Sequence, residues 1–313
     1  MGHSLEAVHL SKRYGSLMAV DNLNFRIDGA KCVGFLGPNG AGKTTTLKIF
    51  TSMINPSTGS TLIDGVSVQE DKKAALRSCG SLVETPEMYH SFTPMEALSM
   101  IAEIRGIPKG ERVRLIRDAV FEVKMDQWMD RKIGKFSKGM KQRINIASAL
   151  LSDPEIVILD EPTSGLDPRG TAEVKSLIKT LKTEGRLIFM SSHLLSEVSE
   201  VCDEVAIIDH GKLLVHDTIR NVTRRFAGKA SSYLVEVEFS KPVTDTKAIS
   251  RLGGVHSVNR IDQWTVQISF SGGMEVQEGL LSKLASTRMG MISFKPVSSE
   301  LEDSYLNLVK DTL

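Results

Sequence analysis

The sequence predicts an α/β protein with a mixed sheet, mostly of parallel strands covered by helices, followed by a small α+β domain. Over residues 1–215, short apolar runs alternate with amphipathic stretches, as in a parallel sheet with helical connections. The run 156–159 (IVIL) is entirely apolar, which is typical of a strand buried on both faces. From about residue 221 the pattern changes to alternating strands and helices in the ferredoxin-like order βαββαβ.

The elements of the first part follow from hydrophobic spacing and from the positions of glycine and proline. Strands are expected at 31–36, 156–159 and 187–190, and helices at 44–53, 173–181 and 196–202. A helical insertion is expected at about 86–135, where the periodic block 96–116 is interrupted by Gly106, Ile107 and Pro108. These elements predict one large domain over residues 1–220.

The second part, residues 221–313, is predicted to form a separate small domain. Alternating strands are expected at 231–239 and 291–297, a hairpin over 255–270, and helices at 246–252, 274–284 and 300–308. The boundary falls within 216–230, although that stretch has no linker rich in Pro, Gly or Ser. A chain of 313 residues has the length of about two domains, in agreement with this division.

Composition excludes several functional classes. The 39 Lys and Arg residues nearly balance the 38 Asp and Glu residues, so no polybasic surface for nucleic acid or lipid is expected. No run reaches the ~18 apolar residues of a membrane span, and residues 1–15 lack the apolar stretch of a signal peptide, so a cytoplasmic location is expected. Cys32, Cys79 and Cys202 show neither metal-ligand nor redox spacing and are expected to be reduced thiols.

The strongest motif is a glycine-rich loop between an expected strand and an expected helix. Residues 37–44 (GPNGAGKT) fit the P-loop pattern in full. The backbone N–H groups of such a loop surround phosphate oxygens, and the following helix adds its positive dipole end. Lys43 is expected to act as a catalytic charge on the β- and γ-phosphates, and the hydroxyl of Thr44 to bind Mg²⁺. The expected nucleotide-binding residues are Gly37, Pro38, Asn39, Gly40, Ala41, Gly42, Lys43, Thr44 and Thr45.

Two carboxylates directly follow the apolar run 156–159. Asp160 and Glu161 therefore stand at the carboxyl end of an expected strand, which is the edge where open α/β sheets bind ligands. In a P-loop enzyme the first acid reaches the Mg²⁺ shell, and the second can orient and deprotonate the attacking water. Asp160 is thus a candidate metal ligand and Glu161 a candidate catalytic base.

Beyond these motifs, the sequence over about residues 5–215 resembles the nucleotide-binding subunits of ATP-binding cassette (ABC) transporters, which have a P-loop NTPase core. Residues 136–140 (FSKGM) stand where that family has its signature motif LSGGQ. Ser137 and Gly139 match the motif, whereas Lys138 and Met140 depart from it. The resemblance implies that Ser137 and Gly139, at the start of a helix, bind ATP that is held by the opposite subunit. Two identical chains, or this chain and a paralogue, are therefore expected to meet head to tail around two ATP–Mg²⁺.

The resemblance assigns four further site residues. Residues 164–167 (SGLD) are similar to the family's D-loop, which places Asp167 at the nucleotide interface. His193 stands where the switch histidine contacts the γ-phosphate, and Tyr14 where an aromatic ring stacks on adenine. Glu84 occupies the place of the Q-loop glutamine and is expected to approach Mg²⁺, although it adds a negative charge beside the phosphates.

The resemblance also implies the biological role of the chain, which is an ATPase coupled to transmembrane transport. The segments 84–89 (ETPEMY) and 137–143 (SKGMKQR), with the appended small domain, look most like ATPase subunits of exporters whose permease is a separate chain. Such a subunit lies on the inner face of the cell membrane through its permease. Residues 91–98 (SFTPMEAL) are the candidate surface for that contact.

Two other functions are compatible with the same motifs. A soluble ABC-type ATPase acting on ribosomes or DNA is one, but only 94 positions separate Lys43 from Ser137 and they contain no heptads, unlike the long coiled coils of DNA-repair relatives. A nucleotide-dependent regulator without catalysis is the other, favoured if the departures at Glu84, Lys138 and Met140 prevent hydrolysis. An ATPase assay distinguishes the regulator from the enzyme.

Overall fold

The computed structural model covers residues 1–313 and describes residues 2–84, 88–222, 233–243, 246–271, 274–286 and 290–296. The chain divides into two compact units, Met1–Asp217 and Thr218–Leu313. The expected helix 300–308 lies outside the described residues, as do residues 86–87 of the expected helical insertion. Among the helices that the structure does describe, none has both the length and the apolar character needed to span a bilayer.

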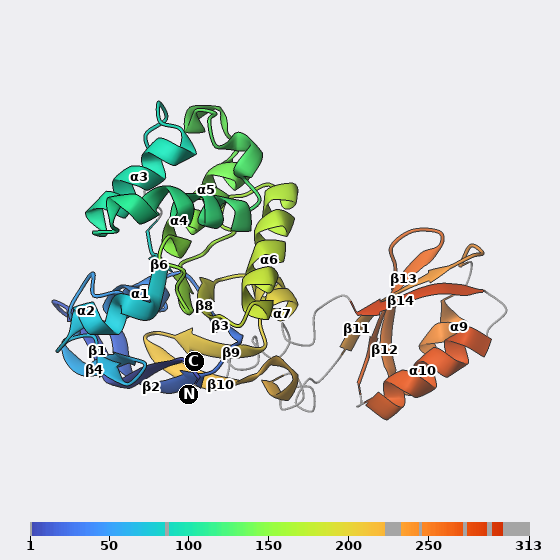
Figure 1. Cartoon of the computed structure of the whole chain (residues 1–313). Helices are drawn as coiled ribbons and strands as arrows, with labels where there is room; N and C mark the ends of the chain where they lie inside the picture. Colours follow the sequence, from blue (N-terminus) through green and yellow to red (C-terminus); the bar gives the residue numbers. More distant parts are fainter. Residues whose placement is uncertain are drawn as a thin grey trace. The chain divides into compact units, whose positions relative to one another are not determined.

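A largely parallel sheet forms the centre of the first unit (Figure 1). Its described strands follow the order β10 (Lys212–Thr218), β9 (Glu204–Asp209), β3 (Cys32–Leu36), β8 (Leu187–Ser192), β7 (Ile156–Leu159) and β6 (Cys79–Leu82). Strands β3, β7 and β8 are buried at every position, which agrees with their continuous apolar sequence. The predicted α/β class is confirmed, and β8 extends two residues past its predicted end to the two serines before His193.

A second, antiparallel sheet was not among the predicted elements. It contains β1 (Ser4–Tyr14), β2 (Leu17–Asp28), β4 (Thr58–Ile63) and β5 (Val66–Ser67), in the order β2-β1-β4-β5. Phe25 of β2 joins it to the central sheet, because its ring centroid lies 6.0 Å from that of Phe35 and 5.7 Å from that of Phe189. The two sheets and α1 (Lys43–Phe50) thus share one apolar core.

Three helices lie together at one end of this unit (Figure 1) and share an apolar core with the central sheet and α6. They are α3 (Pro94–Ile104), α4 (Lys109–Glu122) and α5 (Lys138–Leu150). Helix α3 begins with a reciprocal cap in which Thr93 and Glu96 bond each other's backbone N–H groups. The break between α3 and α4 falls at the predicted interruption, where Gly106 has φ 73°. The remaining helices are α2 (Lys72–Ala75), α6 (Pro168–Thr183) and α7 (Leu195–Val201).

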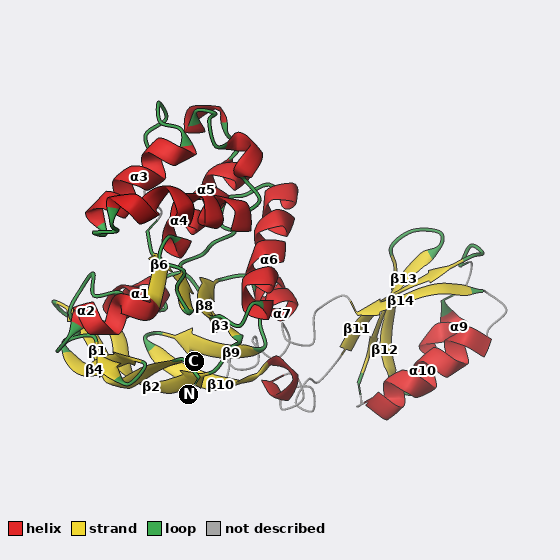
Figure 2. Ribbon diagram, in the orientation of Figure 1, coloured by secondary structure: helices red, strands yellow, loops and turns green. Residues whose placement is uncertain are grey.

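The second unit has the predicted ferredoxin-like order. Its elements are β11 (Tyr233–Phe239), α9 (Lys247–Ser250), β12 (Val255–Arg260), β13 (Thr265–Phe270), α10 (Met274–Ser286) and β14 (Met291–Pro296). The strands pair antiparallel in the order β12-β13-β11-β14. Both helices cover the same face of this sheet (Figure 2), because Ile249 of α9 and Leu280 of α10 share one core with Val237 of β11. The predicted α+β class of this unit is confirmed.

Candidate functional site

The glycine-rich loop lies between β3 and α1, at the carboxyl end of the parallel sheet. Two of its glycines are required by close backbone contacts. A Cβ on Gly37 would lie 2.3 Å from the carbonyl oxygen of Ile208, and a Cβ on Gly42 would lie 2.3 Å from that of Ala19. Gly42 also has φ 104°, which only glycine adopts without strain. No described side chain caps the N-terminus of α1, so its first N–H groups are available to an anion.

Lys43 is held inside this loop. Its side chain is 5% exposed, and Nζ donates hydrogen bonds to the carbonyl oxygens of Gly37 at 2.8 Å and Pro38 at 3.0 Å. Burial lowers the pKa of Lys43, while the nearby carboxylates of Glu161 and Asp160 act in the opposite direction. A cation in a loop of open N–H groups forms a phosphate-binding environment.

Asp160 lies beside Thr44, as expected from the motif spacing. The Thr44 hydroxyl donates to Asp160 Oδ1 at 3.2 Å, and the Ser191 hydroxyl donates to the same oxygen at 2.6 Å. The N–H of Asp160 donates to the carbonyl oxygen of Leu82 at 2.8 Å, which fixes the end of β7 beside the end of β6. Ser191 was not identified from the sequence, although its place at the end of an apolar strand was a usable signal.

Glu161 connects the loop to His193. Its Oε1 lies 3.7 Å from Lys43 Nζ, and its Oε2 lies 3.1 Å from His193 Nδ1. Its backbone N–H donates to the Ser191 hydroxyl at 2.9 Å, and its φ of 42° is unusual for a residue other than glycine. The structure therefore brings together the three side chains expected to be catalytic, which are Lys43, Glu161 and His193.

Glu84 pairs with a residue that the sequence analysis did not single out. Its carboxylate forms a hydrogen bond and ion pair with Lys48 of α1, and its φ is 56°. Thr44, Asp160 and Glu84 supply only oxygen donors, which suit Mg²⁺. No cluster of three or more His, Cys, Asp or Glu side chains arranged to bind a metal occurs in the described part of the chain. These residues thus fit an ion that takes a few protein ligands and completes its shell with phosphate and water.

The signature residues form a second group. Ser137 caps α5 by accepting a hydrogen bond from the N–H of Met140 at 3.2 Å, so its hydroxyl proton is not used by the cap. Gly139 packs closely against α6, since a Cβ there would lie 3.0 Å from Cα of Gly170. Ser137 and Asp167 line the same cavity, of about 450 Å³, together with Gly170.

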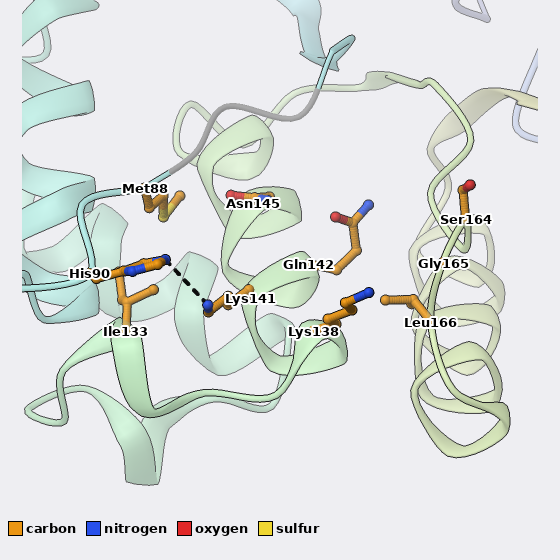
Figure 3. A pocket seen from close by; sticks show the side chains of 10 residues that line it. All are labelled: Met88, His90, Ile133, Lys138, Lys141, Gln142, Asn145, Ser164, Gly165 and Leu166. Atoms are coloured by element: carbon orange, nitrogen blue, oxygen red, sulfur yellow. Dashed lines mark hydrogen bonds between the residues drawn. The ribbon is translucent and has the colours of Figure 1, made fainter.

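Lys138 lies on another side of α5 from this cavity. Figure 3 shows Lys138 and Leu166 pointing toward each other across a cavity of about 270 Å³. This second cavity is lined by Met88, His90, Ile133, Lys138, Lys141, Gln142, Asn145, Ser164, Gly165 and Leu166. It contains the buried Asn145, whose Oδ1 has no hydrogen-bond partner among the described residues. Lys138, which differs from the residue of the family signature, therefore faces the loop 164–166 and not the cavity that Ser137 lines.

Tyr14 stands at the end of β1 and is 46% exposed. Lys12 Nζ lies 5.1 Å from the centre of its ring. A half-exposed ring at a strand end is accessible to a flat ligand such as a purine.

Most of the sequence-predicted residues thus fall into two groups. The first contains the P-loop with Thr44, Asp160, Glu161 and His193, and the second contains Ser137, Gly139 and Asp167. The described contacts join neither Tyr14, which meets Lys12, nor Glu84, which pairs with Lys48 of α1, to these groups. Each group is joined internally by the contacts described above. Each also lies at a helix N-terminus, that of α1, which no described side chain caps, and that of α5, which Ser137 caps.

Comparisons with known proteins place the chain beside ATP-binding proteins of ABC transporters. The profile of the ABC transporter family matches residues 20–164. The bacitracin transport ATP-binding protein BcrA of Bacillus licheniformis is 45% identical over 216 residues, which are 68% of this chain and 69% of that protein. The uncharacterized ABC transporter ATP-binding protein YhcH of Bacillus subtilis (strain 168) is 31% identical over 310 residues, which are 98% of this chain and 96% of that protein. A solved ATP-binding subunit of an ABC transporter superposes with a TM-score of 0.62 at 30% identity, covering 71% of this chain and 92% of the other.

Proposed function

This chain belongs to the ATP-binding, ATP-hydrolysing subunits of ABC transporters, and from that premise we propose that two copies close head to tail around two ATP–Mg²⁺ to drive a separate membrane permease. The observation that carries the proposal is the division of the site into two groups. In the proposed dimer, the P-loop group of one copy and the Ser137 group of the other hold the same nucleotide.

The P-loop group supplies the chemistry on its own nucleotide. Lys43 and the open N–H groups of α1 hold the β- and γ-phosphates, and Tyr14 supports the adenine. Thr44 and Asp160 would hold Mg²⁺, which would neutralise charge on the phosphate oxygens. Glu161 orients the attacking water and accepts its proton. His193 contacts the γ-phosphate and holds the Glu161 carboxylate in place.

The Ser137 group supplies the link between nucleotide and motion. The hydroxyl proton of Ser137, which the cap does not use, and the N-terminus of α5 favour the γ-phosphate of the partner's ATP. ATP therefore stabilises the closed pair by binding both copies, and hydrolysis removes the γ-phosphate contact that favours closure. We propose that this cycle moves a permease from the inner face of the membrane and that the transporter is an exporter, a role supported by the bacitracin transport relative.

Dimerisation of a hydrolysis-deficient variant tests this function. The variant Glu161→Gln is expected to lose most ATP hydrolysis and to accumulate as a dimer with ATP and Mg²⁺, measured by size-exclusion chromatography with light scattering. Without ATP it is expected to be a monomer. Glu161→Gln/Ser137→Arg is the matched control, because it keeps the P-loop and blocks the surface proposed to meet the partner's ATP. It is expected to bind ATP as a monomer.

Two results would contradict the proposal. One is a Glu161→Gln protein that remains monomeric at saturating ATP and Mg²⁺. The other is an ATP-dependent dimer that forms equally well when Ser137→Arg is present, since the two groups would then not share a nucleotide. Unchanged hydrolysis in Glu161→Gln would refute the role given to that carboxylate while leaving the dimer test intact.

A further inference from the structure

The ion pair between Lys48 and Glu84 connects the P-loop helix to the segment after β6. We propose that Lys48 is a positioning residue that holds the Glu84 carboxylate next to the metal site and neutralises it until Mg²⁺–nucleotide binds. The inference rests on the proposed function, because it assigns a role within the same nucleotide site.

The position of Glu84 follows from the sheet. Because the N–H of Asp160 bonds the carbonyl oxygen of Leu82, the chain leaving β6 passes beside the end of β7. Glu84 follows two residues later and turns with φ 56°. This turn brings its carboxylate to α1, where Lys48 receives it.

The position of Lys48 follows from the helix. Thr44 and Lys48 are four residues apart in α1, so their side chains lie on the same face, one turn apart. Thr44 bonds Asp160 and is a proposed Mg²⁺ ligand. A carboxylate bonded to Lys48 is therefore held one helical turn along α1 from Thr44, a residue proposed to bind the metal.

Charge balance explains why a cation is needed there. The carboxylates of Asp160, Glu161 and Glu84 all stand at this edge of the sheet, where a triphosphate has to bind. Lys43 is one compensating cation, and Lys48, whose side chain is 23% exposed, is the second. The pair is weak by itself, since the Glu84 side chain is 60% exposed. Its effect grows when a nucleotide and a partner exclude water from it.

A double-mutant cycle tests this role of Lys48. Nucleotide affinity is measured for four proteins, which are wild type, Lys48→Gln, Glu84→Gln and the double variant. The probe is adenosine 5′-(β,γ-imido)triphosphate, measured by calorimetry with Mg²⁺ and with EDTA. Lys48→Gln leaves Glu84 as an uncompensated charge, so affinity in EDTA is expected to fall about fivefold. With Mg²⁺ the fall is expected to be smaller, because the bound cation itself compensates part of the Glu84 charge. The ratio of the affinity with Mg²⁺ to the affinity in EDTA is therefore expected to be higher in Lys48→Gln than in wild type.

The double variant carries the decisive comparison. Replacing Glu84 removes the charge that Lys48 compensates, so Lys48→Gln is expected to change affinity by less than about twofold in the Glu84→Gln background. Lys31→Gln is the matched control, because Lys31 pairs with Glu204 at 2.7 Å at the opposite end of β3 from the P-loop. It is expected to leave both affinities unchanged.

The outcomes separate this inference from the proposed function. An equal loss of affinity with and without Mg²⁺ would indicate a merely structural role for Lys48 and overturn the inference. So would a Lys48→Gln effect of the same size in both backgrounds, because Lys48 would then act without Glu84. A wild-type chain that binds no nucleotide would overturn the proposed function together with this inference.

Discussion

Glu161 Oε2 and His193 Nδ1 lie 3.1 Å apart, although 32 residues separate them in the chain. Glu161 follows β7 and His193 follows β8, and these strands are parallel neighbours. The pairing of β7 with β8 is therefore what places an imidazole beside the proposed catalytic base. Because Lys43 approaches the other oxygen of the same carboxylate, Glu161 is held from two directions.

Loss of His193 is expected to slow hydrolysis more than it weakens binding. In His193→Ala the Glu161 carboxylate loses one of its two neighbours, so the rate of ATP hydrolysis should fall about 100-fold. Affinity for ATP should change by less than about threefold, because the P-loop is intact. Phosphate release and calorimetry measure the two quantities. Equal losses in both would show that His193 mainly binds nucleotide.

Lys43 is expected to control affinity. In Lys43→Ala the charged hydrogen bonds to phosphate are lost, which should weaken ATP binding about 10- to 100-fold. Lys31→Ala removes a lysine at the other end of β3 and should leave affinity unchanged. Calorimetric titration of both variants with ATP and Mg²⁺ is the measurement. Wild-type affinity in Lys43→Ala would refute the phosphate role.

The conformation of Gly42 is expected to be essential for the loop. Gly42→Ala places a Cβ 2.3 Å from the carbonyl oxygen of Ala19 at φ 104°, a strain of about 1–3 kcal/mol or more. The melting temperature and the ATP affinity should both fall. Gly110→Ala is the matched control, since a Cβ there meets nothing within 4 Å inside α4. It should stabilise the chain by about 0.5–1 kcal/mol, and comparable losses in both variants would contradict this account.

Arg186 is expected to stabilise the junction between α4 and the central sheet. It bonds Glu122 of α4, and also Asp153 at 2.8 Å and the carbonyl oxygen of Pro154 at 3.1 Å. Arg186→Leu leaves the Glu122 carboxylate largely buried without its cation, which should lower the free energy of unfolding by about 2–3 kcal/mol. Urea denaturation checks this value. A loss below about 0.5 kcal/mol would place the pair among weak surface contacts.

Glu122 should also make stability depend on pH. Burial raises the pKa of Glu122 above its ordinary value of 4.5, although Arg186 opposes this effect. A carboxyl group whose pKa is raised in the folded protein stabilises the folded state while it is protonated. This stabilisation is fully present below pH 4.5 and is lost as the pH rises through the pKa that Glu122 has in the folded protein. The unfolding free energy of Glu122→Gln minus that of wild type should therefore increase from about pH 4 to about pH 7. A constant difference would contradict the direction of the shift.

Local patterns predicted much of the fold. Fully apolar strands such as β7 identified the parallel sheet, and the alternating strands from residue 231 onward predicted the ferredoxin-like order, because burial on one or two faces leaves a direct signature in the sequence. The antiparallel sheet was missed. Register shifts near Leu10 and Lys12 disturb the pairing of β1 with β2, but β2 still alternates between buried and exposed residues from Leu23 to Asp28, which was a usable strand signal.

The sequence by itself determined the chemical groups of the nucleotide site, since the P-loop and the acids after β7 are contiguous motifs whose spacing is set by one loop and one strand. Only the tertiary structure decided their partners. Ser191 reaches Asp160, Lys48 reaches Glu84, and Lys138 points away from the Ser137 cavity. The physical reason is that these contacts depend on which strands become neighbours and on the face of a helix that packing leaves open, and neither is encoded within a single segment.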